Sequence, residues 1–181
     1  MEFSNPQKLI VTLLTDIHQA LDIKNSVDPL LVQRVVNSDR GWALEWAYPG
    51  IFEGRDETPQ HVKFVADVLD MWDFLIQAVE ELSPAERAQL EELAPMFGKN
   101  VAFDGFDGNT ETELMVTARI FVDDLNRWSR FKGQDFNSHM PSAAGYERML
   151  DKYAEHNDHF RDLTVEELAA ILNERVHPEN R

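Results

Sequence analysis

Apolar residues recur every three or four positions along almost the whole chain, the spacing that places side chains on one face of a helix. The first such stretch follows Ser4-Asn5-Pro6, where serine or asparagine caps a helix and proline fits its first turn. Its apolar positions are Leu9, Ile10, Leu13, Leu14, Ile17 and Leu21. A second helix is expected from Asp28-Pro29; Gly41 interrupts the pattern before residues 42–46, and Pro49-Gly50 ends it.

The clearest prediction is one long helix from about Thr58-Pro59 to Leu82. Its stripe consists of Val62, Val65, Leu69, Trp72, Ile76 and Val79, widened by Val68 and Leu75. Such a helix extends roughly 36 Å and needs a partner helix that packs nearly parallel to it, as in a helical hairpin. Ser83-Pro84-Ala85-Glu86 has the capping-box pattern, so a new helix is predicted from there to about Leu93.

The second half of the chain is also read as helical. Thr110-Glu111-Thr112-Glu113 suggests another capping box, before a helix that ends near Phe131. Its apolar positions are Leu114, Ala118, Phe121, Leu125 and Trp128. A polar loop from Lys132 to Pro141 precedes a short amphipathic helix around residues 146–153, and a last helix follows Thr164. Only residues 101–103 could form a short extended segment.

These elements predict an all-α, multihelical fold in which a long-helix hairpin packs with a second helical subdomain. A chain of 181 residues fits one domain, here residues 1–181. A division into two subdomains is left open: a hairpin over about residues 24–95, and a compact part made of residues 1–23 and 96–181.

Composition narrows the function classes. The chain has no cysteine, which rules out disulfides, thiolate metal sites and a cysteine nucleophile. Its net charge of -16 disfavours direct contact with nucleic acid and with anionic membranes, because both carry negative charge. No segment approaches the ~20 apolar residues that span a bilayer, and no signal peptide is recognised. The expectation is a cytoplasmic protein.

The least generic stretch is a tandem turn, Phe103-Asp104-Gly105-Phe106-Asp107-Gly108, that runs into the helix after Thr110. Together with motifs elsewhere it resembles the YfbU-like family of bacterial proteins, over nearly the whole chain. The residues that carry the resemblance most specifically are Phe103, Gly105, Phe106, Asp107, Thr110, Glu111, Phe136, Asn137, Pro141, Tyr146 and Arg148. The resemblance implies an all-helical fold and supplies no catalytic residue, since no biochemical function is assigned to the family.

The acidic residues of the tandem turn invite comparison with a calcium loop, but the spacing does not fit. In an EF-hand loop that starts at Asp107, the sixth position would be Thr112 instead of glycine and the twelfth Ala118 instead of glutamate. The favoured interpretation is that Gly105 and Gly108 form turns and that Phe103 and Phe106 fill the core.

Metal and anion sites have weak candidates. His156 and His159 have the i, i+3 spacing of two ligands on one helix face, and Asp107 is a further weak candidate, but no third ligand is visible beside the two histidines. No metal or cofactor is therefore expected. Asp67, Asp70 and Asp73 are interpreted as a solvent-facing set, and Arg119, Asp123 and Arg127 as an ion-pair ladder. Arg127, Arg130 and Lys132 form the densest basic cluster, the first place to look for a bound anion.

No nucleophile, base and orienting carboxylate converge in the sequence, and no catalytic residue is proposed. The preferred hypothesis is a non-enzymatic interaction or regulatory module that self-associates as a dimer or higher oligomer and has a further protein partner. The long striped helix and an aromatic surplus support it. The alternative is a metal-assisted hydrolase or small-ligand-binding protein, with a cleft near the acidic turn, His139 and the C-terminal histidines.

Overall fold

The computed structural model describes residues 2–24, 27–52, 57–156 and 163–180. Helices make up nearly all of its regular structure. The α-helices are α1 (Asn5–Ala20), α2 (Pro29–Asn37), α3 (Trp42–Ala47), α4 (Gln60–Glu81), α5 (Pro84–Leu93), α6 (Thr112–Arg119), α7 (Ala143–His156) and α8 (Val165–Asn173). A π-helix, η1 (Ile120–Asp124), and two 3-10 turns, η2 (Ser129–Phe131) and η3 (Pro178–Asn180), complete the order. Within the described ranges the only β pairing is a single bridge between Phe106 and Asn137, so the all-α prediction is confirmed.

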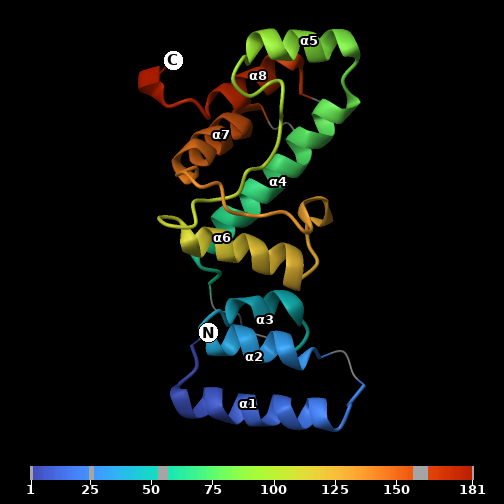
Figure 1. Ribbon diagram of the computed structural model, residues 1–181, viewed down its shortest axis with the longest axis vertical. Helices are drawn as coiled ribbons and strands as arrows, with labels where there is room; N and C mark the ends of the chain where they lie inside the picture. Colours follow the sequence, from blue (N-terminus) through green and yellow to red (C-terminus); the bar gives the residue numbers. More distant parts are fainter. Residues whose placement is uncertain (1, 25–26, 53–56, 157–162, 181) are drawn as a thin grey trace.

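The molecule is elongated, and the helices follow one another along its long axis (Figure 1). α1 lies at one end, with α2 and α3 beside it; α6 comes next, and α5 and α8 lie at the opposite end. The long helix α4 runs obliquely through the upper part and packs against α6 and α7. The hairpin partner expected for α4 was the helix that follows it, but α5 packs against α8 instead.

Most predicted helix starts are confirmed by their caps. The Asp28 carboxylate accepts the Leu30 amide at 2.9 Å, and Ser83 and Glu86 form the expected capping box. Thr164 and Glu167 form another one at the start of α8. The box predicted at Thr110 is wrong, because α6 begins at Thr112, one residue later than predicted, and its N-cap residue Glu111 makes no side-chain cap.

The helix predicted to continue to about Phe131 is also shorter in the structure. α6 ends at Arg119 and passes into the π-helix η1, where the Leu125 amide donates to the Ile120 carbonyl at 2.9 Å. Trp128 has a positive φ of 44°, and its indole N–H donates to Asp70 on α4 at 2.7 Å. A residue with positive φ cannot continue a right-handed helix, so Trp128 cannot belong to the longer helix that the apolar pattern predicted. Its contact with Asp70 comes from a distant part of the chain.

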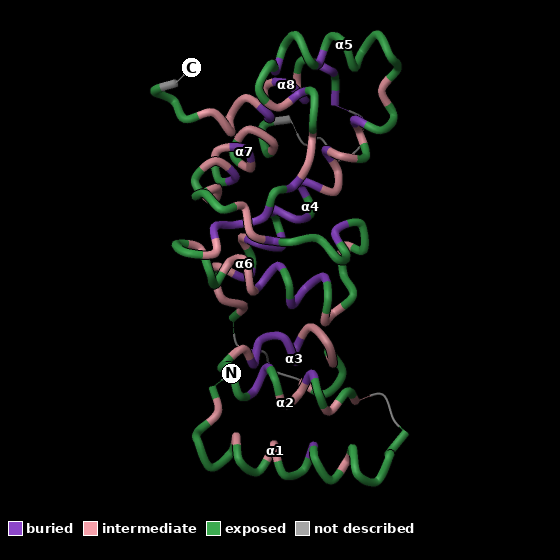
Figure 2. The backbone as a smooth tube through the Cα atoms, viewed as in Figure 1, coloured by how far each residue is buried: buried purple, intermediate pink, exposed green. Residues whose placement is uncertain are grey.

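The core follows α4 through the body of the molecule (Figure 2). Trp72 at its centre is fully buried and lies in edge-to-face contact with Tyr146, with ring centroids 5.7 Å apart. A second aromatic contact joins the N-terminal helices to this body: Phe121 of η1 lies 5.2 Å from Trp42 and 4.8 Å from Trp46 of α3. Such pairs add roughly 0.5–1.5 kcal/mol beyond the area they bury.

The position of α1 differs from the subdomain division considered from the sequence. Residues 1–23 were grouped with residues 96–181, whereas α1 packs against α2 and lies far from α7 and α8 (Figure 1). Side chains on the polar side of α1 bond to α2, and these contacts place α1 with the N-terminal helices.

Candidate interaction surface

The outer side of α1 is an exposed aliphatic face, and most of α1 has the colour of exposed residues in Figure 2. Six of its side chains are between 53% and 67% exposed, which is unusual for leucine and isoleucine at helical spacing. These are Leu9, Ile10, Leu13, Leu14, Ile17 and Leu21, and they are called the α1 outer face below. They occupy one half of the helix circumference, and none of them is charged.

The opposite side of α1 attaches the helix to α2 through polar groups. Thr15 is the one buried residue of α1, and its hydroxyl accepts a hydrogen bond from the Gln33 amide at 3.2 Å. The Asn37 amide lies 3.4 Å from the Thr12 hydroxyl, and Lys8 pairs with Asp39 at 2.6 Å. The amphipathic helix is therefore inverted: its polar side faces the protein and its apolar side faces water.

The exposed area is large for a monomeric protein. An aliphatic side chain of this size that is more than half exposed leaves on the order of 100 Å² in water, so the α1 outer face amounts to about 600 Å². The largest apolar patch of a typical monomer measures about 300–600 Å² and is often functional. The α1 outer face is therefore a candidate interaction surface.

The family-motif residues form a separate site around the tandem turn. Gly105 has a φ of +88°, and a Cβ there would lie 2.1 Å from the Phe136 carbonyl oxygen, so only glycine fits. Phe103 and Phe106 are buried, as expected. The Phe106 amide donates to the Phe136 carbonyl at 2.9 Å, which pairs the turn with the segment before α7.

Asp107 organises the turn with its carboxylate. It accepts the Thr110 hydroxyl at 2.6 Å and the backbone amides of Thr110 and Asn109 at 3.1 and 3.2 Å. The Thr110 hydroxyl, followed by the smaller contributions of these amides, lowers the pKa of Asp107 against the opposing effect of burial. Its oxygens are thus engaged as hydrogen-bond acceptors, the arrangement of an Asx turn.

Glu111 connects the turn to α7. Its carboxylate accepts the amides of Asp107, Ser142 and Ala143 at 3.0, 3.0 and 2.9 Å. Ala143 is the first residue of α7, and a carboxylate is stabilised where unpaired helix amides point. Asn137 completes the network by accepting the Gly108 amide at 2.9 Å. Asp107, Glu111 and Asn137 therefore connect the turn before α6 to the segment that leads into α7.

A cleft of about 340 Å³ lies beside this network, at the C-terminal end of α8. Pro141, Arg148 and His177 are among its lining residues. Arg148 donates to the carbonyls of Ala144 and Glu174 at 2.8 and 3.0 Å, and the Arg175 guanidinium pairs with Asp104. Both guanidinium groups thus already hold carbonyl or carboxylate oxygens, which binds the chain end to α7.

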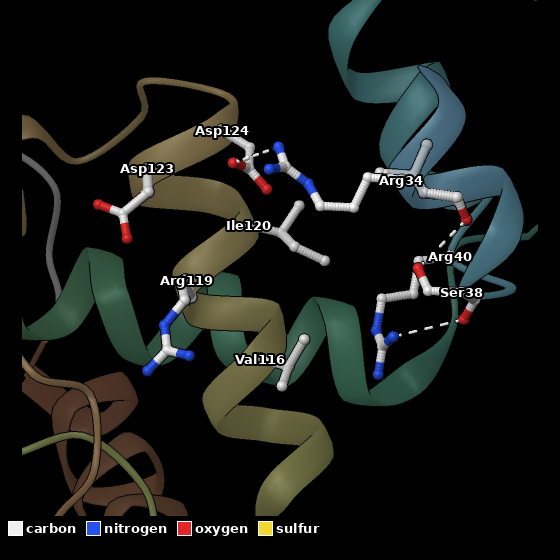
Figure 3. Close-up of a pocket in the computed structure, with 9 residues that line it drawn as sticks. Arg34, Ser38, Arg40, Val116, Arg119, Ile120, Asp123 and Asp124 are labelled. Atoms are coloured by element: carbon white, nitrogen blue, oxygen red, sulfur yellow. Dashed lines mark hydrogen bonds and ion pairs between the residues drawn. The ribbon is translucent and has the colours of Figure 1, made fainter. Parts of the chain in front are cut away.

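A second cleft, of about 380 Å³, separates α2 from α6 and η1 (Figure 3). Val116 and Ile120 point across it toward α2 in this view. Arg34 pairs with Asp124 at 2.6 Å and Arg40 pairs with Glu113 at 2.6 Å, both across the boundary between the N-terminal helices and the body. Burial raises the pKa of Asp124, and the Arg34 charge opposes this. An anion that entered the cleft would compete with these carboxylates for the guanidinium groups.

Of the metal-site candidates, only Asp107 has a side chain that the structure describes. Asp107 is held in its turn as described above, His156 ends α7 with its side chain outside the described residues, and His159 lies outside them entirely. Among the side chains that are described, no three histidines or carboxylates form a group that could hold a metal ion. His139 is exposed, and its amide donates to Asn137 at 3.0 Å. The hydrolase alternative thus finds no support here.

Asp70 and Asp73 on α4 face the loop that follows η1. Asp70 accepts the Trp128 indole N–H, and Asp73 pairs with Arg130 at 2.7 Å. Asp67 is exposed; partial burial and the Asp70 charge raise its pKa. Two of these three aspartates are therefore tertiary acceptors, in addition to lying outside the apolar stripe.

The predicted basic features are dispersed. No ion pair links Arg119, Asp123 and Arg127, all of which are described, because the α-helix ends at Arg119, Asp123 lies in the π-helix and Arg127 lies beyond it. The ladder prediction is wrong. Arg127 lies over the Trp46 ring, 4.7 Å from its centroid. Lys132 donates to Asn126 at 2.8 Å. The cluster therefore forms no shared anion site.

A comparison with known proteins identifies the family of this chain. The family model for the YfbU domain matches residues 1–174, which include every helix from α1 to α8. The chain belongs to the YfbU domain family. This YfbU protein is also similar to UPF0304 protein MJECS11 of Methanocaldococcus jannaschii, with 29% identity over 124 residues that cover 65% of this chain and 70% of the relative.

The relative is archaeal, whereas the sequence motifs resemble a family of bacterial proteins. Its function is uncharacterised, and no activity comes to this chain with the match. No helix in the described part of the YfbU protein combines the length and the apolar character needed to cross a membrane.

The sequence analysis did not single out the α1 outer face as the candidate surface. The periodicity identified these residues as one stripe. The contacts of an interface were expected from exposed aromatic side chains instead. All four tryptophans prove to be buried or half-buried, and Phe131 and Phe136 are fully buried. A usable signal was the polar pair Gln33 and Asn37, which share one side of α2 and bond to Thr15 and Thr12 of α1 in the structure.

Proposed function

We propose that this YfbU protein is a non-enzymatic interaction module that functions in a self-associated form. The observation that carries the proposal is the α1 outer face, six aliphatic side chains that are each more than half exposed. Covering it would remove about 600 Å² of apolar surface from water in each copy, and burial of apolar surface drives most protein association.

The chemistry of the surface favours a protein contact over a lipid contact. Helices that lie on membranes are rich in Lys and Arg on the polar side, and these residues attract anionic headgroups. In α1 the only such residue is Lys8, which is paired with Asp39 of the protein's own chain. The net charge of -16 adds repulsion from an anionic bilayer.

The test is the mass in solution of the parent chain and of Leu13→Glu/Ile17→Glu, measured by sedimentation velocity at low micromolar concentration. Leu13 and Ile17 face away from α2, so the substitution leaves the attachment of α1 intact. We expect a dimer or larger species for the parent and a folded monomer for the variant.

Leu93→Glu is the matched control, because Leu93 is also an exposed leucine, 42% accessible, at the opposite end of the molecule. It should retain the mass of the parent. A strictly monomeric parent would refute the proposed function.

A further inference from the structure

We infer that two copies of the chain pair through the α1 outer face with their α1 helices antiparallel, Leu13 and Leu14 lying at the centre of the contact. This rests on the proposed self-association and names the partner as a second copy. It also names the orientation, which self-association alone does not fix.

The size of the face agrees with a pair. Two faces of about 600 Å² bury about 1,200 Å² in total, the lower limit for a specific protein–protein interface. A two-fold dimer requires the same patch on both subunits to fit itself, and a flat aliphatic face with no charged member meets that condition. A different protein would need a specific group to recognise, and the face presents no charged or polar side chain for such a partner to bind.

The position of α1 allows the contact without steric or electrostatic conflict. α1 forms one extremity of the elongated molecule, and its outer face points away from α2 and the body (Figure 1). Two copies that meet there extend in opposite directions, so their strongly negative bodies remain apart. Like charges farther apart than the Debye length of about 10 Å are largely screened at ordinary ionic strength.

The pattern along α1 favours the antiparallel orientation. With Leu13 opposite Leu14 of the second copy, Ile10 lies opposite Ile17 of that copy, so the four central positions of the α1 outer face meet one another. Opposed helix dipoles add a small favourable term in this orientation. Asp16 borders the face. A parallel pair would place Asp16 of one copy beside Asp16 of the second copy, whereas the antiparallel pair separates these two carboxylates along the helix axis.

Disulfide trapping tests the pairing, because the parent chain contains no cysteine. Two cysteines bridge only when their Cα atoms approach within about 7 Å. Leu13→Cys lies next to the two-fold axis, and we expect it to form a covalent dimer under mild oxidation. Gln77→Cys, on the exposed side of α4, is the control for random collision and should remain monomeric.

Ile10→Cys and Ile17→Cys decide the orientation. In the antiparallel pair, two copies of either variant place their cysteines seven residues apart along the helices, roughly 10 Å, so neither variant alone should cross-link. An equimolar mixture should cross-link, as Ile10 then meets Ile17. Cross-linking of each variant alone, without a mixed product, would establish parallel helices and overturn the inference.

The outcomes separate this inference from the proposed function. A dimer in sedimentation that Leu13→Cys fails to trap would overturn the α1 contact and leave self-association standing on another surface. A monomer in sedimentation would overturn both. Circular dichroism of each reduced variant verifies that the helical fold is retained, which the exposure of the substituted residues leads us to expect.

Discussion

The side-chain amide of Gln33 on α2 donates a hydrogen bond to the buried Thr15 hydroxyl of α1, at 3.2 Å. The same amide also reaches the Asp16 carboxylate at 3.1 Å. The Thr15 hydroxyl itself lies 2.9 Å from the Val11 carbonyl. α1 thus depends on these polar contacts and on the partly buried Val11 for its position, while the six residues of the α1 outer face lie on the side away from α2.

Gln33→Ala should therefore loosen α1 selectively. Loss of the amide leaves the buried Thr15 oxygen without its donor, at a cost of about 1–3 kcal/mol. Because α1 contacts mainly α2, we expect faster hydrogen exchange of the α1 amides while the amides of α4 exchange as in the parent. Gln77→Ala is the control, since Gln77 bonds only to an exposed carboxylate of its own helix, Glu81. Unchanged protection of α1 in Gln33→Ala would contradict this role.

Gly105→Val should severely impair folding. The residue needs a φ of +88°, and a Cβ would lie 2.1 Å from backbone atoms of Phe136 that cannot move aside without breaking the bridge to Phe106. We expect a loss of more than about 4 kcal/mol of unfolding free energy, or no folded protein. Thermal and urea melts measure it.

Gly133→Val separates steric clash from backbone strain. Gly133 has a similar φ of +80°, but no atom lies within 4 Å of a Cβ built there. Its substitution should cost only the strain of a positive φ, about 1–2 kcal/mol. Equal melting temperatures for the two variants would show that the close approach to Phe136 is unimportant.

Glu111→Gln should weaken the connection between α6 and α7. The carboxylate accepts hydrogen bonds from backbone amides of both segments. Glutamine has only one acceptor oxygen, and its NH₂ group would face backbone N–H groups that are themselves donors. We expect a loss of about 1.5–3 kcal/mol in a urea melt. Glu113→Gln is the matched change, because Glu113 is half exposed and pairs with Arg40, and exposed pairs are worth about 1 kcal/mol or less. A Glu111→Gln variant as stable as Glu113→Gln would contradict the linking role.

The sequence predicted the parts of the fold that depend on local chemistry. The long helix was placed from about Thr58-Pro59 to Leu82, and α4 runs from Gln60 to Glu81. Capping boxes located the starts of α5 and α8, because the cap residues and the amides they bind lie within one turn. The turn at Gly105 followed from glycine between two phenylalanines, both of which the structure buries.

The errors concern long-range contacts. The apolar stripe continues past Arg119, but Trp128 turns toward Asp70 on α4, a residue 58 positions away that no local pattern can supply. The same limit applies to α1. Helical spacing shows that Leu13 and Ile17 share a side, yet only the polar partners on α2 decide that this side is left exposed.

Tyr146 gives the protein a specific alkaline sensitivity. Burial raises its pKa to about 12, and the nearby Arg175 charge only partly offsets this. Since the ordinary value is 10.0, the folded state favours neutral tyrosine. The stabilisation, on the order of 2–3 kcal/mol, is complete below pH 10 and is lost as the pH rises toward 12.

The measurement is urea unfolding between pH 8 and about 12, for the parent and for Tyr146→Phe. Phenylalanine does not ionise and keeps the ring contacts with Trp72 and Phe106, so the variant should lose less stability with pH than the parent. Tyr153→Phe is the control: its pKa is also raised by burial, but it is only half-buried, so its removal should change the slope less. Identical pH slopes for the parent and Tyr146→Phe would contradict this prediction, because they would mean that burial does not raise the pKa of Tyr146 in the folded state.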